Sequence, residues 1–164
     1  MTAVLFVCLG NICRSPAAEA MLRHLALQRQ LSLSIQSCGI GGWHVGEAPD
    51  ERMQQAARAR DIVMNSRAQQ FHVKFFEEFD YILAADQEVL QDLQRQAREP
   101  HHQNKLHLMT AFSQHHCGKE VLDPYYSDAA AFEQVLSMLE DACEGLLQEI
   151  STVKADSKFA INKI

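Results

Sequence analysis

A short loop near the N-terminus, set between an apolar run and an alanine-rich segment, constrains the fold more than any other stretch. Residues 3–7 are all apolar, the loop then reads C-L-G-N-I-C-R-S from Cys8, and A-A-E-A-M-L follows Pro16. A continuous apolar run fits a strand buried on both faces of a parallel sheet, and proline suits the first turn of a helix. We therefore expect a strand at 3–8, a tight loop, and a helix at 16–30.

The rest of the chain alternates between the same two kinds of element. Apolar or alternating runs predict strands, and longer stretches of good helix formers predict helices. The expected elements are strands at 31–38, 61–64, 80–85 and 106–112, helices at 50–60, 87–97 and 129–150, one or two helical turns in 68–77, and a loop at 99–104. This alternation predicts a single α/β domain, with a parallel twisted sheet and helices on both faces.

Length, charge and cysteine content narrow the class of protein. The 164 residues fit one domain, which we expect over 1–150, followed by a loosely ordered tail at 151–164. The net charge of −6 argues against nucleic-acid binding. No apolar run is long enough to cross a membrane, and the run at 3–9 lacks the basic flank of a signal peptide. Five cysteines without regular spacing favour a reducing compartment. We expect a cytoplasmic protein, with secretion by a route without a signal peptide left open.

The loop itself combines three chemical functions. Backbone N–H groups of a tight loop and of a helix N-terminus converge on an anion, and the same field acidifies a thiol such as Cys8. The guanidinium of Arg14 matches two phosphate oxygens at once. We expect Cys8 to act as a nucleophile on phosphorus and Arg14 to bind the phosphate. The expected phosphate-binding loop residues are Leu9, Gly10, Asn11, Ile12, Cys13 and Ser15.

Three of these loop residues have more specific expected roles. Gly10 permits a positive φ angle, Asn11 tolerates one and can hold the loop through its side chain, and Ser15 can donate to the thiolate of Cys8. The acid for the leaving oxygen must come from elsewhere in the chain. We predict Asp123, because Asp123-Pro124 restricts a loop expected near the upper edge of the sheet.

Four collinear segments over residues 3–150 resemble the low-molecular-weight protein tyrosine phosphatases. They read V-C-L-G-N-I-C-R-S-P-A-A-E-A, G-W-H-V-G-E-A-P-D-E-R, F-D-Y-I-L-A-A-D and D-P-Y-Y. The resemblance implies a four-stranded parallel sheet flanked by helices and a cysteine-dependent hydrolase of phosphotyrosine that uses no metal or other cofactor. It implies Cys8 as nucleophile, Arg14 as phosphate binder and Asp123 as general acid and then general base. Pocket walls are implied at Trp43, Tyr125 and Tyr126.

The resemblance also implies the partners. The substrate would be a tyrosine-phosphorylated protein or an aryl phosphate, and phosphate, sulfate or vanadate would bind in the loop. No nucleic acid or membrane partner is expected, and the chain would be a monomer or a weak homodimer. Some relatives form a reversible disulfide under peroxide, which would join Cys8 and Cys13 here and make the site redox-sensitive.

The chain also departs from the family pattern. The serine and histidine that brace the loop asparagine in some members fall at Gly41 and at Ser66 or Arg67 here, so the sequence does not say how Asn11 is held.

Three other functions are alternatives to phosphotyrosine hydrolysis: phosphoarginine hydrolysis, arsenate reduction and phosphotyrosine binding without catalysis. Related arginine phosphatases place threonine where Ile12 stands, and related arsenate reductases carry extra cysteines near Ala84-Ala85, where this chain has none. A phosphotyrosine-binding regulator without activity is the alternative from outside the enzymes. Pairs of neighbouring histidines, as at 101–102 and 115–116, rarely point the same way, and no spaced pair completes a zinc pattern, so no metal site is expected.

Overall fold

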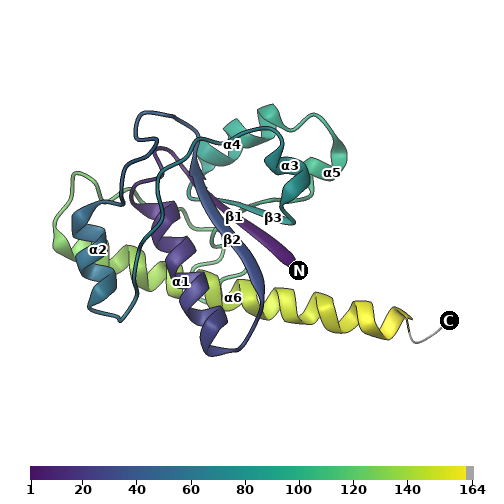
Figure 1. Ribbon diagram of the computed structural model, residues 1–164. Helices are drawn as coiled ribbons and strands as arrows, with labels where there is room; N and C mark the ends of the chain where they lie inside the picture. The colour runs from purple at the N-terminus through teal and green to yellow at the C-terminus, as the bar shows by residue number, and fades with distance from the viewer. Residues whose placement is uncertain (162–164) are drawn as a thin grey trace.

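The computed structural model describes residues 1–161 and is built around one parallel sheet (Figure 1). Its four strands run in the order β2-β1-β3-β4. Their bounds are β1 Thr2–Cys8, β2 Leu33–Gly39, β3 Tyr81–Ala84 and β4 Leu106–Leu108. The central strand β1 pairs with β2 and β3, and Cys8 is in register with Gly39 at the carboxyl end. The predicted four-stranded α/β fold is thus confirmed, and its first strand ends where the loop begins.

Helices cover both faces of this sheet (Figure 1). One face packs against α1 Arg14–Gln28, α2 Glu51–Arg58 and α6 Ala129–Ile161, and the other against α3 Phe75–Glu78 and α4 Gln87–Gln96. Alternate side chains of β1 divide between the two cores: Val4 and Phe6 join the first, and Leu5 and Val7 the second. Burial on both faces explains why the strand is apolar throughout.

Two aspartates cap the helices that the sequence predicts at 50–60 and 87–97. The side chain of Asp50 accepts from the N–H groups of Arg52 and Met53 at the start of α2, and that of Asp86 accepts from Val89 at the start of α4. Such N-caps satisfy amides that have no partner inside the helix. The first turn of α1 differs, because Cys13 at its N-cap makes no side-chain hydrogen bond to it.

Several boundaries differ from those that the sequence predicts. Residues 61–64 are not a strand, and β4 ends at Leu108 rather than 112. The stretch 99–104 contains the short helix α5, Pro100–Gln103, because proline suits a first helical turn. Residues 151–161 continue α6 instead of forming a loose tail, although each of these eleven side chains is exposed; the rest of the expected tail lies outside the described residues.

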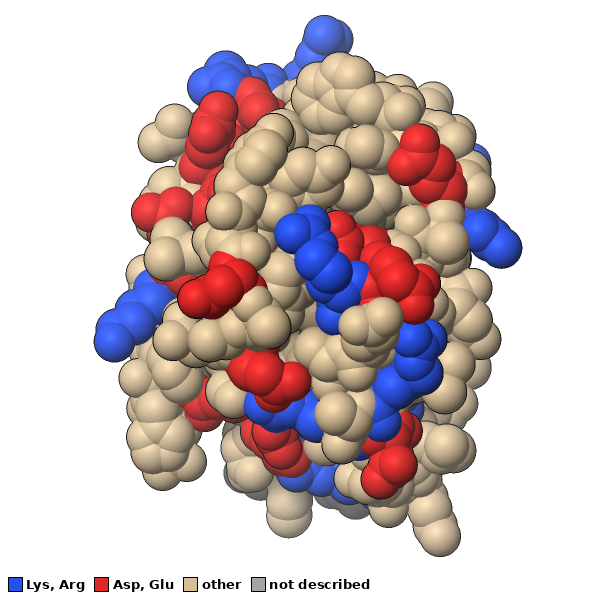
Figure 2. All heavy atoms as spheres, turned by 90° about the vertical axis from the view of Figure 1, so that its left-hand side faces the viewer, with Lys and Arg blue, Asp and Glu red and all other residues tan. Residues whose placement is uncertain are grey.

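The outer surface carries charges of both signs. Figure 2 shows basic and acidic side chains interspersed on the face around α2 and the first turns of α6. Arg58 pairs there with Glu51, and Arg60 pairs with Glu133 and Glu140. Among residues 1–161, none of the helices is long and apolar enough to span a membrane.

Candidate active site

A cavity of about 260 Å³ opens at the carboxyl end of β1, where ligands of parallel α/β sheets bind. Three segments far apart in sequence form it: the loop between β1 and α1, the loop after β2, and the stretch before α6. The lining residues are Cys8, Leu9, Gly10, Ile12, Cys13, Arg14, Trp43, His44, Asp123, Tyr125 and Tyr126. The cavity therefore brings together the predicted nucleophile, phosphate binder and acid.

The sulfur of Cys8 lies among hydrogen-bond donors. Its Sγ is 2.9 Å from Oγ of Ser15 and accepts from the backbone N–H of Asn11 at 3.3 Å. The first-turn amides of α1, which has neither a side-chain cap nor an acidic residue there, add the positive end of the helix dipole. The sulfur thus lies at the positive end of a helix, and the first-turn amides are available to an anion.

The loop is held from below by the side chain of Asn11, which is buried at φ 57°. Its Nδ2 donates to Oγ of Ser15 at 2.8 Å and to Oγ of Ser37 at 3.0 Å, and its Oδ1 accepts from the N–H of Gln69 at 2.9 Å. Ser37 in turn donates to the buried carboxylate of Glu19 at 3.1 Å. Because Asn11 donates to Ser15, the single hydroxyl hydrogen of Ser15 is shared between the Cys8 sulfur at 2.9 Å and the carbonyl of Cys38 at 3.3 Å.

These contacts answer the question of bracing that the sequence leaves open. Gly41 and the side chains of Ser66 and Arg67 are not the hydrogen-bond partners that hold Asn11. Ser37, inside β2, takes the serine's place, and a backbone N–H at Gln69 serves in place of a histidine side chain. An amide N–H donates as an imidazole would, so the sequence motif can vary while the hydrogen bond remains.

The glycines of the site act by close approach rather than by a positive φ. Asn11, not Gly10, takes the left-handed conformation, so the role predicted for Gly10 is wrong. A Cβ on Gly10 would lie 3.1 Å from the ring of His44. A Cβ on Gly39 would lie 2.9 Å from the backbone of the loop, so β2 can approach the loop only without a side chain there.

Arg14 is buried and is fixed by partners from the N-cap of α4 and from the segment before α6. Its Nη1 donates to Asp86 at 2.7 Å and to the carbonyl of Val121 at 3.0 Å, and its Nη2 lies 3.7 Å from the carboxylate of Asp123. Burial opposes the charged form, but the negative charges of Cys8, Asp86 and Asp123 prevail and raise the pKa of Arg14. The guanidinium therefore stays charged and aimed while it lines the cavity.

The opposite wall of the cavity is more exposed. The side chain of Asp123 is 48% accessible, Tyr126 is 97% accessible, and the two tyrosine rings meet edge to face with centroids 4.9 Å apart. The guanidinium of Arg52 lies 5.4 Å from the Tyr125 ring, so α2 supports this wall from behind. Trp43 lines the cavity from the loop after β2.

Most of the residues predicted for the site meet in this cavity. Asn11 and Ser15 do not line it and lie beneath the loop instead. The sequence missed the roles of His44, Asp86, Ser37 and Glu19. Asp86 directly precedes the predicted helix at 87–97; one of its oxygens caps α4 and the other accepts from Arg14. Its position directly after a strand's carboxyl end was the available signal.

The two cysteines nearest the nucleophile differ from it. Burial, reinforced by Asp50, raises the pKa of the Cys13 thiol, and burial followed by the charge of Cys8 raises that of Cys38. Both are free thiols, as is Cys8. A regulatory disulfide between Cys8 and Cys13 stays a prediction.

Known proteins share this sequence and architecture. The sequence profile of the low molecular weight phosphotyrosine protein phosphatase family matches residues 3–157. The low molecular weight protein-tyrosine-phosphatase YfkJ of Bacillus subtilis is 39% identical over 159 residues, which cover 94% of this chain and 99% of that one. A protein tyrosine phosphatase structure from Entamoeba histolytica superposes with a TM-score of 0.90 at 34% identity, covering 94% and 99% of the two chains. A drosophila arginine phosphatase superposes with a TM-score of 0.84 at 32% identity, covering 92% and 98%.

Proposed function

The chain belongs to the low molecular weight phosphotyrosine protein phosphatase family, and from this premise we propose how its cavity carries out hydrolysis. It is a protein tyrosine phosphatase, a hydrolase, with Cys8, Arg14 and Ser15 placed as in a phosphate-binding loop. The observation that supports the assignment of roles is the convergence of Cys8, Arg14 and Asp123 on one cavity.

In the first step the Cys8 thiolate attacks phosphorus in line with the phenolic oxygen. A sulfur–phosphorus bond forms, the phosphorus–oxygen bond breaks, and Asp123 gives its proton to the leaving oxygen. Arg14 and the loop amides hold the equatorial phosphate oxygens, whose charge they stabilise as the bonds exchange. Asp86 keeps the Arg14 guanidinium in place, through the 2.7 Å hydrogen bond to Nη1.

In the second step water releases the phosphate. Asp123, now a carboxylate, takes a proton from a water molecule, whose oxygen attacks the phosphocysteine. The sulfur–phosphorus bond breaks, and Ser15 donates a hydrogen bond to the departing thiolate. Phosphate leaves and Cys8 returns to its starting state, so the cycle needs neither metal nor redox partner.

The cavity walls support phosphotyrosine as the substrate group. Trp43, Tyr125 and Tyr126 can flank an aryl ring, whereas a phosphoserine is too short to bring its phosphorus past these rings to Cys8. Phosphate-like anions should occupy the same loop. The family implies phosphoproteins as substrates. A tyrosine-phosphorylated protein as the substrate and a cytoplasmic location of the enzyme stay predictions.

Phosphoarginine is the second candidate, since one similar structure is an arginine phosphatase. Phosphotyrosine and phosphoarginine versions of one peptide, tested side by side without added metal, decide between them. We expect turnover of the phosphotyrosine peptide, competitive inhibition by vanadate, and no turnover by Cys8→Ser. Faster release from phosphoarginine would overturn the substrate assignment, and full activity of Cys8→Ser would overturn the mechanism.

A further inference from the structure

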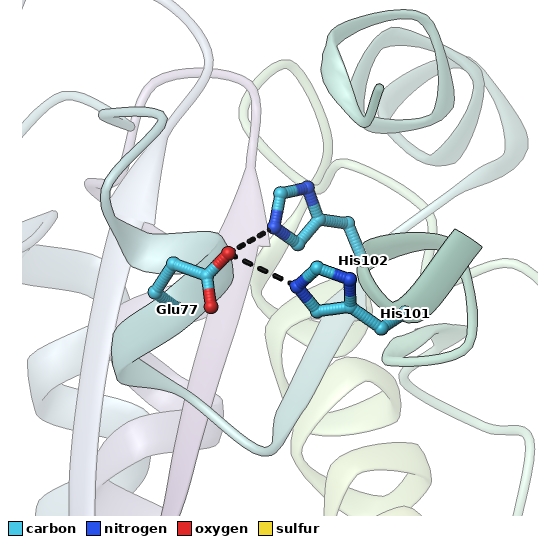
Figure 3. Close-up of side chains that lie close together, drawn as sticks. All are labelled: Glu77, His101 and His102. Carbon is cyan, nitrogen blue, oxygen red and sulfur yellow. Dashed lines mark hydrogen bonds and ion pairs between the residues drawn. The ribbon is translucent and has the colours of Figure 1, made fainter. Parts of the chain in front are cut away.

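Three potential metal ligands converge on the side of the sheet covered by α3, α4 and α5 (Figure 3). Glu77 comes from α3, and His101 and His102 come from α5. Their ligand atoms all lie within 4.8 Å of one another. Both imidazole Nε2 atoms contact the same carboxylate oxygen of Glu77, the one from His101 at 3.0 Å. None of the three residues lines the cavity around Cys8.

Neighbouring histidines seldom converge, and the geometry of α5 explains why these do. The helix is a single turn that opens with Pro100, and the two rings lie 4.2 Å apart at an interplanar angle of 58°. The ring of His102 stacks on Phe76 with centroids 5.0 Å apart, which holds it in place. Glu77, one residue after Phe76, then faces both rings. The third ligand lies 24 residues before His101, so spacing within the histidine pair could not predict it.

The two ring nitrogens of His102 have different surroundings. Its Nδ1 is buried and has no hydrogen-bond partner among the described residues, whereas its Nε2 faces Glu77 and His101. A charged carboxylate and two imidazoles with their Nε2 atoms turned inward form a ready set of donors.

We propose that Glu77, His101 and His102 bind one divalent transition-metal ion, of which zinc is the representative. Two histidines and one glutamate are a recognised zinc ligand set, with water at the open position, and imidazole also suits cobalt, nickel and copper. Ligand bonds of about 2.0–2.2 Å place tetrahedral donors about 3.3 Å apart, near the separation found here between Glu77 and His101. Glu77 and His101 are exposed, so small side-chain movements can complete the geometry.

The ion would tie α3 to α5 and lie apart from the phosphatase chemistry. Lys74, Arg95 and Arg98 line a neighbouring groove together with His102, and their positive charges oppose a cation. Three protein ligands in this field bind more weakly than a closed four-ligand structural site. We therefore expect reversible binding that stabilises the folded chain without being needed for folding or for turnover.

Cobalt(II) is the probe that tests the site. The chelator-treated protein is titrated with Co²⁺ while its visible absorption is recorded, and Zn²⁺ is then added as a competitor. We expect one Co²⁺ per chain with the visible bands of nitrogen and oxygen coordination, displaced by Zn²⁺, and a higher melting temperature with either ion. Sulfur-to-cobalt charge transfer in the near ultraviolet identifies any ion held by Cys8 or Cys117 instead.

Variants decide whether these three residues hold the ion. Glu77→Gln and His101→Gln, both at exposed positions, should weaken Co²⁺ binding by about tenfold or more and remove the shift in melting temperature. The matched control Glu78→Gln, next in the same helix, should bind as the parent does. Parent-like binding by Glu77→Gln and His101→Gln, absence of binding by the parent, or spectra of thiolate coordination alone would overturn the proposal. Phosphotyrosine hydrolysis by Glu77→Gln should be unchanged, so this test is independent of the proposed catalytic roles.

Discussion

The loop between β1 and α1 and the segment before α6 share one cavity but are built in opposite ways. Asn11, Arg14 and Ser15 are buried, and the side chain of each forms a hydrogen bond to another element. Asp123 is half-exposed; its side chain accepts a hydrogen bond from the N–H of Tyr125 and lies 3.7 Å from the guanidinium of Arg14. Tyr126 is almost fully accessible.

This difference separates two requirements of the reaction. Donors that stabilise a developing charge must already be in position, and burial with full hydrogen bonding keeps them there. The wall that admits a phosphorylated side chain and transfers a proton must be open to the substrate. Changes in the buried loop should therefore reduce chemistry and stability, whereas changes in the exposed segment should affect leaving-group dependence or substrate affinity without affecting the fold.

The largest loss is expected from Arg14→Lys. Lysine keeps the positive charge but cannot bind Asp86 and two phosphate oxygens with one planar group, so kcat/KM should fall by about 10³-fold. Initial rates with an aryl phosphate give the value, and a thermal melt shows whether the fold is retained. Arg58→Lys, at an exposed arginine of α2, is the control. A loss of less than tenfold in a folded Arg14→Lys would contradict the role of the buried guanidinium.

A smaller and selective loss is expected from Asp123→Asn. Without a proton donor, kcat/KM should fall by about 10²-fold for phenols of high pKa and much less for nitrophenol-like leaving groups. The melting temperature should not change, because Asp123 is half-exposed. Rates across a series of substituted phenyl phosphates measure the dependence. A uniform loss across the series would remove Asp123 from the acid role.

Asn11→Ala tests the brace rather than the reacting groups. It would leave Ser37 and the N–H of Gln69 without their partner, which should lower the free energy of unfolding by about 1–3 kcal/mol. Denaturant unfolding measures this value, and kcat should fall by about tenfold because Ser15 and the loop lose their positions. Ser127→Ala, at an exposed position, serves as the control. Unchanged stability and kcat would show that the loop keeps its conformation without the hydrogen bonds of the Asn11 side chain.

The smallest effect is expected from Tyr126→Ala. Its ring is exposed in the free protein and meets the neighbouring Tyr125 ring edge to face, so its loss should act on substrate affinity: KM for a phosphotyrosine peptide should rise by about threefold to tenfold while kcat is kept. Steady-state kinetics with the peptide and with a small aryl phosphate separate the two parameters. A fall in kcat with unchanged KM would contradict this, because it would assign Tyr126 a role in the chemical step, as expected for the buried loop, and not in substrate affinity.

The same two regions show what the sequence can and cannot predict. The apolar strand, the loop motif and the Asp-Pro pair mark Cys8, Arg14 and Asp123, because local sequence determines these positions. The partners of Asn11 could not be found in this way: Ser37 reaches it through strand pairing, and Gln69 through a backbone N–H, which no residue type encodes. The exposed turns of α6 beyond Ile150 lack an apolar stripe, so the tail was expected to be loosely ordered.

The central claim is that the buried loop carries the covalent chemistry, and acid-quenched mass spectrometry during turnover tests it most directly. Asp123→Asn should be used with a good leaving group, since it forms the intermediate but lacks the base that hydrolyses it. The mechanism predicts one phosphoryl group on the peptide that contains Cys8, and none after Cys8→Ser. Phosphate on another residue, or turnover with no phosphoprotein in the quenched Asp123→Asn variant, would contradict it.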